Sequence, residues 1–312
     1  MALTGATGFL GRHLVPFLHA QGHKVRILTR RDPAFAEWRG IELEAVPGDL
    51  DDERALQRLV AGADVVIHAA GLIKARHEED FFAVNREGAR HLAIITAREA
   101  PRAGFVLISS LVAREPDLSP YTASKRAGEM AVSEILPSGQ LTIVRPPAIY
   151  GPADAETRTL FRLATSRLVP LATPAEARLA LIHVTDAARA IVAFASAAAD
   201  GFTGRWTICD PHPEGYTLRE VLRTAAHALG KHPHFVQLPP AALQTLGLLG
   251  ESWAALSGRA VMLTQAKTRE LRHNDWSVGE NELPPPNLWK PRISMAEGIA
   301  KTALWYRAHG QI

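Results

Sequence analysis

Cysteine is nearly absent from this chain, since Cys209 is its single example in 312 residues. One cysteine excludes a disulfide within the chain and a cluster of cysteines around a metal ion. Charge of one sign is also not in excess: 35 Lys and Arg residues face 32 Asp and Glu residues, and no dense basic block occurs. We therefore expect no nucleic-acid partner.

Long apolar runs are missing too. No uncharged run approaches the roughly 20 residues that a membrane-spanning helix needs, and no secretory signal precedes the first motif. We expect a cytoplasmic protein, although the short opening Met1–Leu3 leaves open a natural start further upstream. The composition, with 47% hydrophobic and 21% charged residues, is that of a soluble chain long enough for one α/β domain and a smaller lobe.

A glycine-rich segment opens the chain. Thr4–Gly11, TGATGFLG, spaces three glycines as G-x-x-G-x-x-G between a short apolar stretch and a helix-like run. A glycine turn between a strand and a helix lets backbone N–H groups approach a pyrophosphate, which the positive end of the helix also stabilises. The segment therefore predicts a dinucleotide site that includes Gly5, Thr7, Gly8, Phe9, Leu10 and Gly11.

Strand-like and helix-like patterns alternate through the first half of the chain. Strands are expected at 24–29, 43–46, 63–68, 105–109 and 141–145, and helices at 10–21, 51–61, 78–99 and 121–135. Such alternation predicts an α/β fold with a doubly wound parallel sheet, the Rossmann fold.

The pattern changes near Pro146, where prolines and short elements follow without strict alternation. We therefore expect an NAD(P)-binding domain over 1–150, to which 179–200 returns, and a smaller C-terminal substrate lobe formed mainly by 151–312. His183 and Asp186 are expected to tie the returning helix to the core. Further helices are expected at 217–229, 240–256 and 294–309, the last with Ser294 as its N-cap.

The stretch 240–256 carries apolar residues near helical spacing: Leu243, Leu246, Leu248, Leu249, Trp253 and Leu256. This spacing favours an ordinary core-facing helix. The alternative is an apolar wall of the substrate cleft or a surface that rests on a membrane.

The end of the second strand indicates which dinucleotide is bound. Arg30 and Arg31 follow Thr29, and no carboxylate occurs before Asp32. A carboxylate at this place would bind the ribose hydroxyl of NAD, whereas guanidinium groups suit the extra phosphate of NADP. We therefore expect NADP(H), with NAD(H) as the alternative. The plainer interpretation of the two arginines is a solvated surface pair.

Two further strand ends are expected beside the cofactor. Asp49 and Leu50 follow the third strand, where Asp49 either accepts a hydrogen bond from the adenine or serves only as an acid at a helix N-terminus. After the fourth strand, which ends in a core residue, His68, a bulky side chain would collide with the cofactor. The residues there are small: Ala69, Ala70 and Gly71.

The segment Tyr121–Lys125, YTASK, places a tyrosine and a lysine on one helix face. A phenol with a pKa of about 10 is a poor acid or base at neutral pH, and a neighbouring ammonium group together with a cofactor cation would lower that pKa. Tyr121 then becomes a usable proton donor to a carbonyl oxygen whose carbon receives hydride. Ser109 and Ser110 end the preceding strand, where a hydroxyl can hold the same oxygen.

These motifs resemble the extended short-chain dehydrogenases/reductases, also called the NAD-dependent epimerase/dehydratase family, over nearly the whole chain. The resemblance rests on Thr4–Gly11, Val84–Gly88, Ile108–Ser110, Tyr121–Lys125, Arg145–Pro152, His183–Ala190 and Thr302–Gly310. It implies Ser110, Tyr121 and Lys125 as the catalytic trio, Asn85 in support, and Lys125 also on the nicotinamide ribose.

The resemblance further implies a wall beside the nicotinamide, formed by Pro146, Ala148 and Ile149, and a homodimer through the helix of Tyr121. Two departures put a sugar-nucleotide substrate in doubt. Ala148 stands where sugar-nucleotide epimerases and dehydratases often carry Asn, and only 111–120 separates Ser110 from Tyr121.

The motif over 145–152 is closer to the branch of 3β-hydroxysteroid dehydrogenases and dihydroflavonol reductases, whose substrates are largely apolar ketones and alcohols. It is also similar to complex I accessory subunits and bacterial sphingolipid ketone reductases. We therefore expect NADPH-dependent reduction of an apolar or lipid-like ketone. The alternatives are a nucleotide-sugar epimerase or dehydratase, and a cofactor-binding subunit or sensor without turnover.

Overall fold

The computed structural model describes residues 1–31, 33, 35–239 and 265–312. The helix expected at 240–256, with its apolar residues from Leu243 to Leu256, lies outside the described residues, as does Asp32. Within the described ranges, no helix is both long enough and apolar enough to cross a membrane.

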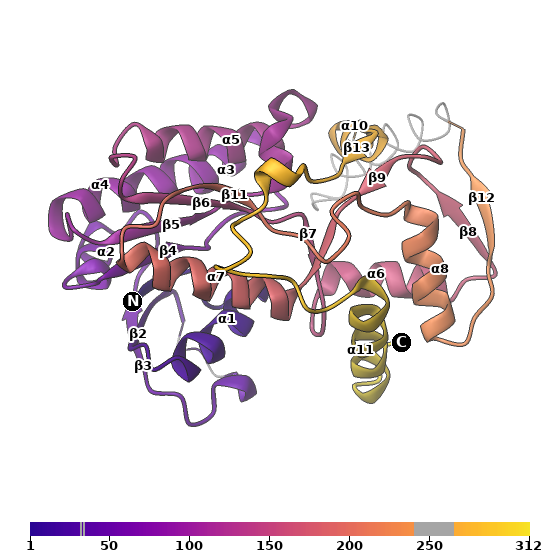
Figure 1. Cartoon of the computed structure of the whole chain (residues 1–312), viewed down its shortest axis with the longest axis horizontal. Helices are drawn as coiled ribbons and strands as arrows, with labels where there is room; N and C mark the ends of the chain where they lie inside the picture. Colours follow the sequence, from indigo (N-terminus) through magenta and orange to yellow (C-terminus); the bar gives the residue numbers. More distant parts are fainter. Residues whose placement is uncertain (32, 34, 240–264) are drawn as a thin grey trace.

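Seven parallel strands form the central sheet, in the spatial order β11-β6-β5-β4-β1-β2-β3 (Figure 1). The strands are β1 (Ala2–Thr4), β2 (Val25–Thr29), β3 (Leu43–Pro47), β4 (Val65–His68), β5 (Gly104–Ile108), β6 (Leu141–Arg145) and β11 (Gly204–Thr207). The strand order reverses between β1 and β4, and ligands of such sheets bind at this reversal, outside the carboxyl ends of the strands. The predicted Rossmann fold is confirmed.

Helices cover both faces of the sheet, which explains why its central strands are apolar on both sides. On one face, α1 (Phe9–Ala20) packs against α7 (Val184–Ala199) over one apolar core. On the other face, a second apolar core lies under α2 (Glu53–Val60), α4 (Ala89–Glu99) and α5 (Pro120–Ser133).

The second lobe has an apolar core of its own under α6 (Ala155–Ala164), α8 (Leu218–Ala228) and α11 (Met295–Ala308) (Figure 1). Ser294 caps α11 by accepting the N–H of Glu297, as predicted. The remaining described helix of this lobe is α10 (Gln265–Arg272). Three two-stranded sheets complete the described part: β7 (Ala148–Tyr150) with β10 (Leu181–His183), β8 (Leu168–Leu171) with β12 (His234–Gln237), and β9 (Arg178–Leu179) with β13 (Asp275–Trp276).

The chain returns to the first domain through α7 and then adds β11 beside β6. The predicted domain bounds place β11 in the second lobe, because four residues between a helix and a loop carry no clear pattern. The Nδ1 atom of His183 accepts the N–H of Thr185 at 3.3 Å. Buried Asp186 accepts the backbone N–H groups of Arg292 and Ile293 at 2.6 and 2.7 Å. The structural role expected for His183 and Asp186 is confirmed.

One buried carboxylate joins α5 to two strands. Glu129 on α5 accepts hydrogen bonds from Nε and Nη2 of Arg145, at the end of β6, at 2.7 and 2.6 Å. The hydroxyl of Ser109, which follows β5, donates to the same carboxylate at 2.5 Å. Glu129 and Arg145 are 1% and 6% exposed. Each charge therefore depends on the other for the interactions it would otherwise make with water.

Removal of one side of this pair should destabilise the whole protein. We expect Glu129→Ala to lower the free energy of unfolding by about 3–5 kcal/mol, because the charge of Arg145 is left buried without its partner. The control is Glu44→Ala, which breaks an exposed ion pair with Arg26 at 2.8 Å and should have little effect. Urea denaturation followed by circular dichroism measures both variants, and equally small effects would contradict this account of Glu129.

Candidate active site

The glycine-rich loop joins β1 to α1 and approaches the end of β4 closely. Gly5 has a φ of +72°, and a Cβ atom there would lie 2.4 Å from the backbone nitrogen of Ala70. A Cβ at Gly11 would lie 2.2 Å from the carbonyl oxygen of Gly5. Gly8 stands at the N-cap of α1 and has no side chain to bond the first N–H groups. These N–H groups can therefore bind an anion.

The other predicted loop residues lie on the same turn. Thr7 is exposed beside Gly8, whereas Phe9 and Leu10 begin α1 and are half-buried. The ring of Phe9 packs edge-on against His13, with ring centroids 5.5 Å apart. The structure thus brings together all six residues that the glycine motif predicts.

Arg30 and Arg31 are exposed directly after β2. The hydroxyl of Thr29 donates to the carbonyl oxygen of Arg31 and holds this turn. Neither guanidinium group forms an ion pair with another described residue, whereas Arg12 on α1 is paired with Glu37 at 2.6 Å. The two charges predicted to bind a phosphate are therefore available.

Asp49 is an exposed residue in the loop after β3. One of its carboxylate oxygens accepts the N–H of Asp51 at 3.0 Å. The cap of α2 is Asp52, which accepts the N–H of Ala55 at 3.0 Å. Asp49 is thus a turn residue and not the helix cap, and its contact with adenine stays a prediction.

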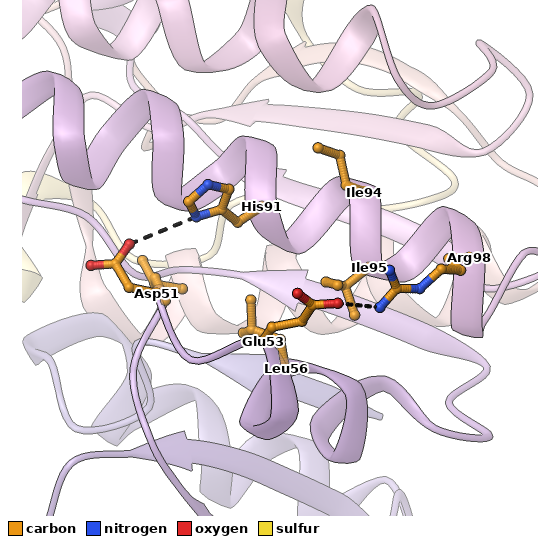
Figure 2. A pocket seen from close by; sticks show the side chains of 8 residues that line it. Asp51, Glu53, Leu56, His91, Ile94, Ile95 and Arg98 are labelled. Carbon is orange, nitrogen blue, oxygen red and sulfur yellow. Dashed lines mark hydrogen bonds and ion pairs between the residues drawn. The ribbon is translucent and has the colours of Figure 1, made fainter.

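A cavity of about 320 Å³ lies between α2 and α4, and Leu50 forms part of its wall. Figure 2 shows two ion pairs beside it: Asp51 with His91 at 3.7 Å, and Glu53 with Arg98 at 2.6 Å. The residues that line it include none of the predicted catalytic residues. The reacting groups are therefore expected elsewhere, at the carboxyl ends of β4 and β5.

The residues after β4 are small, and a side chain at Gly71 would be crowded by Asn85 and Lys125. A Cβ atom at Gly71 would lie 3.2 Å from Oδ1 of Asn85 and 3.6 Å from Nζ of Lys125. Ala69 and Ala70 precede it and are half-buried.

His68, the last residue of β4, is a core residue, as predicted. Its Nδ1 atom lies 2.7 Å from Oγ1 of Thr4, and the side chain is 1% exposed. Burial, aided by the charge of Lys125, lowers the pKa of His68 to about 3. The imidazole is therefore neutral at physiological pH.

Asn85 joins the loop after β4 to α5. Its Nδ2 donates to the carbonyl oxygen of Leu72 and to Oγ of Ser124, both at 2.9 Å, and its Oδ1 accepts the N–H of Leu72 at 2.8 Å. Gly128 allows α5 to approach this segment, because a Cβ there would lie 2.3 Å from the carbonyl oxygen of Asn85.

The prediction of one regular helix over 78–99 is wrong around Asn85. A π-helical segment, Ala83–Gly88, separates α3 (Glu78–Phe82) from α4. Such segments often occur at functional sites. The apolar pattern of the sequence does not distinguish π-helical from α-helical turns, so this break had no readable signal.

Ser110 and Tyr121 come together at the end of β5. Ser110 lies close enough to the phenol to act on its ionisation, and the ring centroid of Phe81 lies 5.8 Å from that of Tyr121. Ser109 is bound to Glu129 instead. Of the two serines, Ser110 is therefore the one placed to share an oxygen with Tyr121.

The ammonium group of Lys125 alone does not lower the pKa of Tyr121. Removal of the phenol from water raises this pKa to about 12; the nearby Ser110 opposes the shift and the charge of Glu270 adds to it. The Nζ atom of Lys125 donates to the carbonyl oxygen of Ile108 at 2.9 Å. Burial lowers the pKa of Lys125 to about 8, although the charge of Glu129 acts in the opposite direction. The ammonium group thus does not outweigh the desolvation of the phenolate.

The predicted wall follows β6. Pro146 is buried, and its carbonyl oxygen accepts the N–H of Leu111 at 2.9 Å, which ties the wall to the segment after Ser110. Ala148 is exposed and Ile149 half-buried at the start of β7.

Sequence reasoning missed two buried carboxylates. Glu129 follows Lys125 by one helical turn, and this spacing was the available signal. Glu270 is on α10 and lies beside the start of α5, where its carboxylate accepts a hydrogen bond from the hydroxyl of Ser119 at 2.5 Å. No local pattern could have indicated a contact across about 150 residues of sequence.

Comparisons with known proteins agree with this geometry. The profile of the NAD dependent epimerase/dehydratase family matches residues 1–209. Ceramide reductase of Caulobacter vibrioides is 46% identical over 310 residues, which cover 99% of this chain and 95% of that protein. The chain therefore belongs to the NAD-dependent epimerase/dehydratase family, the extended short-chain dehydrogenases/reductases.

Two further proteins are similar over different extents. The 4-hydroxy-2-methyl-3-oxo-4-farnesyl-3,4-dihydroquinoline-1-oxide ketoreductase of Stigmatella aurantiaca is 31% identical over 170 residues, or 49% of this chain and 51% of that protein. The crystal structure of UDP-glucose 4-epimerase from Thermus thermophilus superposes with a TM-score of 0.66 at 21% identity, covering 98% of each chain. At this identity the epimerase shows the shared fold alone.

Substitution of Gly5 tests the packing of the glycine-rich loop. Gly5→Ala adds a methyl group against the backbone of Ala70, whereas Gly22→Ala, at a similar φ of +79°, meets nothing within 4 Å. Both variants incur the left-handed strain of about 1–2 kcal/mol, so we expect the larger loss of unfolding free energy for Gly5→Ala. Equal losses in thermal denaturation would show that the loop does not press against β4.

Proposed function

We propose that this protein is an NADPH-dependent reductase that converts an apolar or lipid-like ketone into a secondary alcohol. One observation carries the proposal: Ser110 and Tyr121 come together at the end of β5, and Tyr121 shares its helix with Lys125. The similarity to a ceramide reductase over nearly the full length supports both the reaction and the substrate class. The ketoreductase relative, whose printed substrate carries a farnesyl group, supports them further.

The residues present fit a dinucleotide. The first turn of α1 has N–H groups for a pyrophosphate, and the glycines around it bring the backbone close. Arg30 and Arg31 would hold the 2′-phosphate of NADP. Lys125, beside the gap at Gly71, would bind the nicotinamide ribose. The cofactor, when bound, supplies the hydride.

Two side chains, Ser110 and Tyr121, supply the hydrogen bond and the proton that ketone reduction requires. Ser110 donates a hydrogen bond to the substrate carbonyl oxygen and polarises it. Tyr121 then transfers its proton to that oxygen as negative charge develops there. A pKa of about 12 keeps the phenol protonated at neutral pH, and an alkoxide is a stronger base than a phenolate. Proton transfer from Tyr121 to the alkoxide therefore remains favourable, although the raised pKa makes the phenol a weaker acid.

Apolar groups near these residues favour an apolar substrate. The ring of Phe81 packs on Tyr121, and Ile73, in the loop held by Asn85, is 60% exposed. Ala148 offers a methyl group where sugar-nucleotide enzymes of this family often carry Asn. An epimerase is therefore the weaker alternative, and it would return the hydride to its substrate without net use of NADPH.

Three further expectations belong to this proposal. We propose that 1–150, with the returning segment 179–200, binds the cofactor, while the rest of 151–312 mainly binds substrate. A homodimer through α5 remains a prediction, as does a cytoplasmic location. Met130, which is 54% exposed on α5, is a suitable apolar contact for a second copy.

Tyr121→Phe tests the proton donor. We expect the rate of ketone reduction to fall by about 10²–10⁴-fold, because only the phenolic proton is removed. NADPH binding, measured by fluorescence titration, should stay unchanged. Tyr216→Phe, which removes a hydroxyl bonded to Asp210 in the second lobe, serves as the matched control and should keep its activity. Turnover of Tyr121→Phe at the normal rate would exclude Tyr121 as the acid.

The pair Arg30→Ala and Arg31→Ala tests the choice of cofactor. Loss of both charges should raise the Kd for NADPH by about tenfold or more, because charge-assisted bonds to the phosphate are lost. The Kd for NADH should change little. Arg39→Ala with Arg102→Ala, two other exposed arginines, controls for net charge. Equal losses for both cofactors would refute the preference for NADP(H).

A further inference from the structure

The helix that carries the proposed proton donor begins with an unusually well-bonded cap. Ser119 is the N-cap of α5, and its Oγ accepts the N–H of Thr122 at 3.2 Å. Its own N–H donates to Oγ1 of Thr122 at 3.0 Å. Tyr121 is only the second residue of α5, in the first turn, where N–H groups have no intrahelical acceptor. The cap therefore controls where the phenol lies.

The same hydroxyl has a second partner in the other lobe. Oγ of Ser119 donates to Oε1 of Glu270 at 2.5 Å, and Glu270 is 7% exposed. A hydroxyl that donates to a carboxylate becomes a better acceptor for the helix N–H. The negative charge also lies at the positive end of α5, where it is favourable. Glu270 thus strengthens the cap in two ways.

Neighbouring contacts hold α10 and β13 against the entrance to α5. Nε of Arg269 donates to the carbonyl oxygen of Leu118 at 2.9 Å. From the other side, Arg114 donates to the carbonyl oxygens of Ser277 and Asp275 at 3.0 and 2.6 Å. The second lobe therefore contacts the segment just before Tyr121 at several points, and Glu270 is the buried contact among them.

We propose that Glu270 is a positioning residue of the proposed reductase, which acts through Ser119 to fix the first turn of α5 and hence the phenol of Tyr121. This inference rests on the proposed function for its catalytic consequence. It makes the second lobe a part of the catalytic apparatus, because α10 contributes the carboxylate. In support of this role, the two groups are close enough for the charge of Glu270 to act on Tyr121.

The test compares four variants in the full chain: Glu270→Ala, Glu270→Gln, Ser119→Ala and the double variant Ser119→Ala with Glu270→Ala. We expect Glu270→Ala to lower kcat for ketone reduction by about tenfold, through a displaced phenol, while the KM for NADPH stays unchanged. Glu270→Gln keeps an acceptor oxygen and should retain kcat within about twofold of the wild type. The double variant should lose no more kcat than Ser119→Ala, because Ser119→Ala already removes the bond through which Glu270 acts on α5.

Glu282→Gln is the matched control. Glu282 pairs with Arg114 at 3.5 Å, in the same contact between the second lobe and the segment before α5, but it does not contact Ser119. It should behave as the wild type. A normal kcat in Glu270→Ala, a loss that Gln does not rescue, or additive losses in the double variant would overturn the proposal. If Glu270→Ala does not fold, the comparison of Glu270→Gln with Ser119→Ala decides.

Hydrogen exchange separates this inference from the proposed function. Amide groups of residues 121–123 should exchange faster in Glu270→Ala and Ser119→Ala than in Glu270→Gln, whether or not any ketone is turned over. Unchanged exchange in Glu270→Ala would overturn the role of Glu270 alone. Wild-type protein that reduces no ketone, while exchange changes as expected, would instead contradict the proposed function.

Discussion

The carboxylate of Glu129 is the constraint on which the rest of this site depends. It binds Arg145 at the end of β6 and Ser109 at the end of β5, and it projects from the helix that carries Tyr121 and Lys125. Two neighbouring strands and the helix that connects them are thereby fixed at one buried point. Because unpaired burial of either charge is costly, the arrangement has few alternatives.

This anchor lies beyond the middle of α5, so the start of the helix needs a separate one. Ser119 supplies the cap, and Glu270 bonds it from the second lobe. On the opposite side of the site, Asn85 ties the loop after β4 to Ser124 on the same helix. The proposed chemistry therefore depends on polar contacts from four distant segments, with Gly71 leaving the space between Asn85 and Lys125.

Local signals allowed most of the fold to be predicted. The glycine turn at Gly5, the buried strands and the spacing of Tyr121 and Lys125 follow from periodicity and residue type, and the structure confirms their placement. The effect of desolvation on the pKa of Tyr121 could not be predicted, since a sequence shows the neighbouring Lys125 but not the burial of the phenol. The π-helical turn at Asn85, the edge strand β11 and the contact of Glu270 depend on tertiary packing, which no local pattern encodes.

In the proposed reaction, hydride passes to a ketone while Tyr121 supplies the proton. The most direct test is mass spectrometry of the products formed with NADPH that carries deuterium at both C4 positions, across sterol, long-chain acyl and sphingoid ketones. We expect a secondary alcohol with one deuterium on the carbinol carbon and one NADP⁺ formed per product. Absence of deuterium from the product of every ketone, or its entry into a sugar-nucleotide without net oxidation of NADPH, would contradict the proposed reaction.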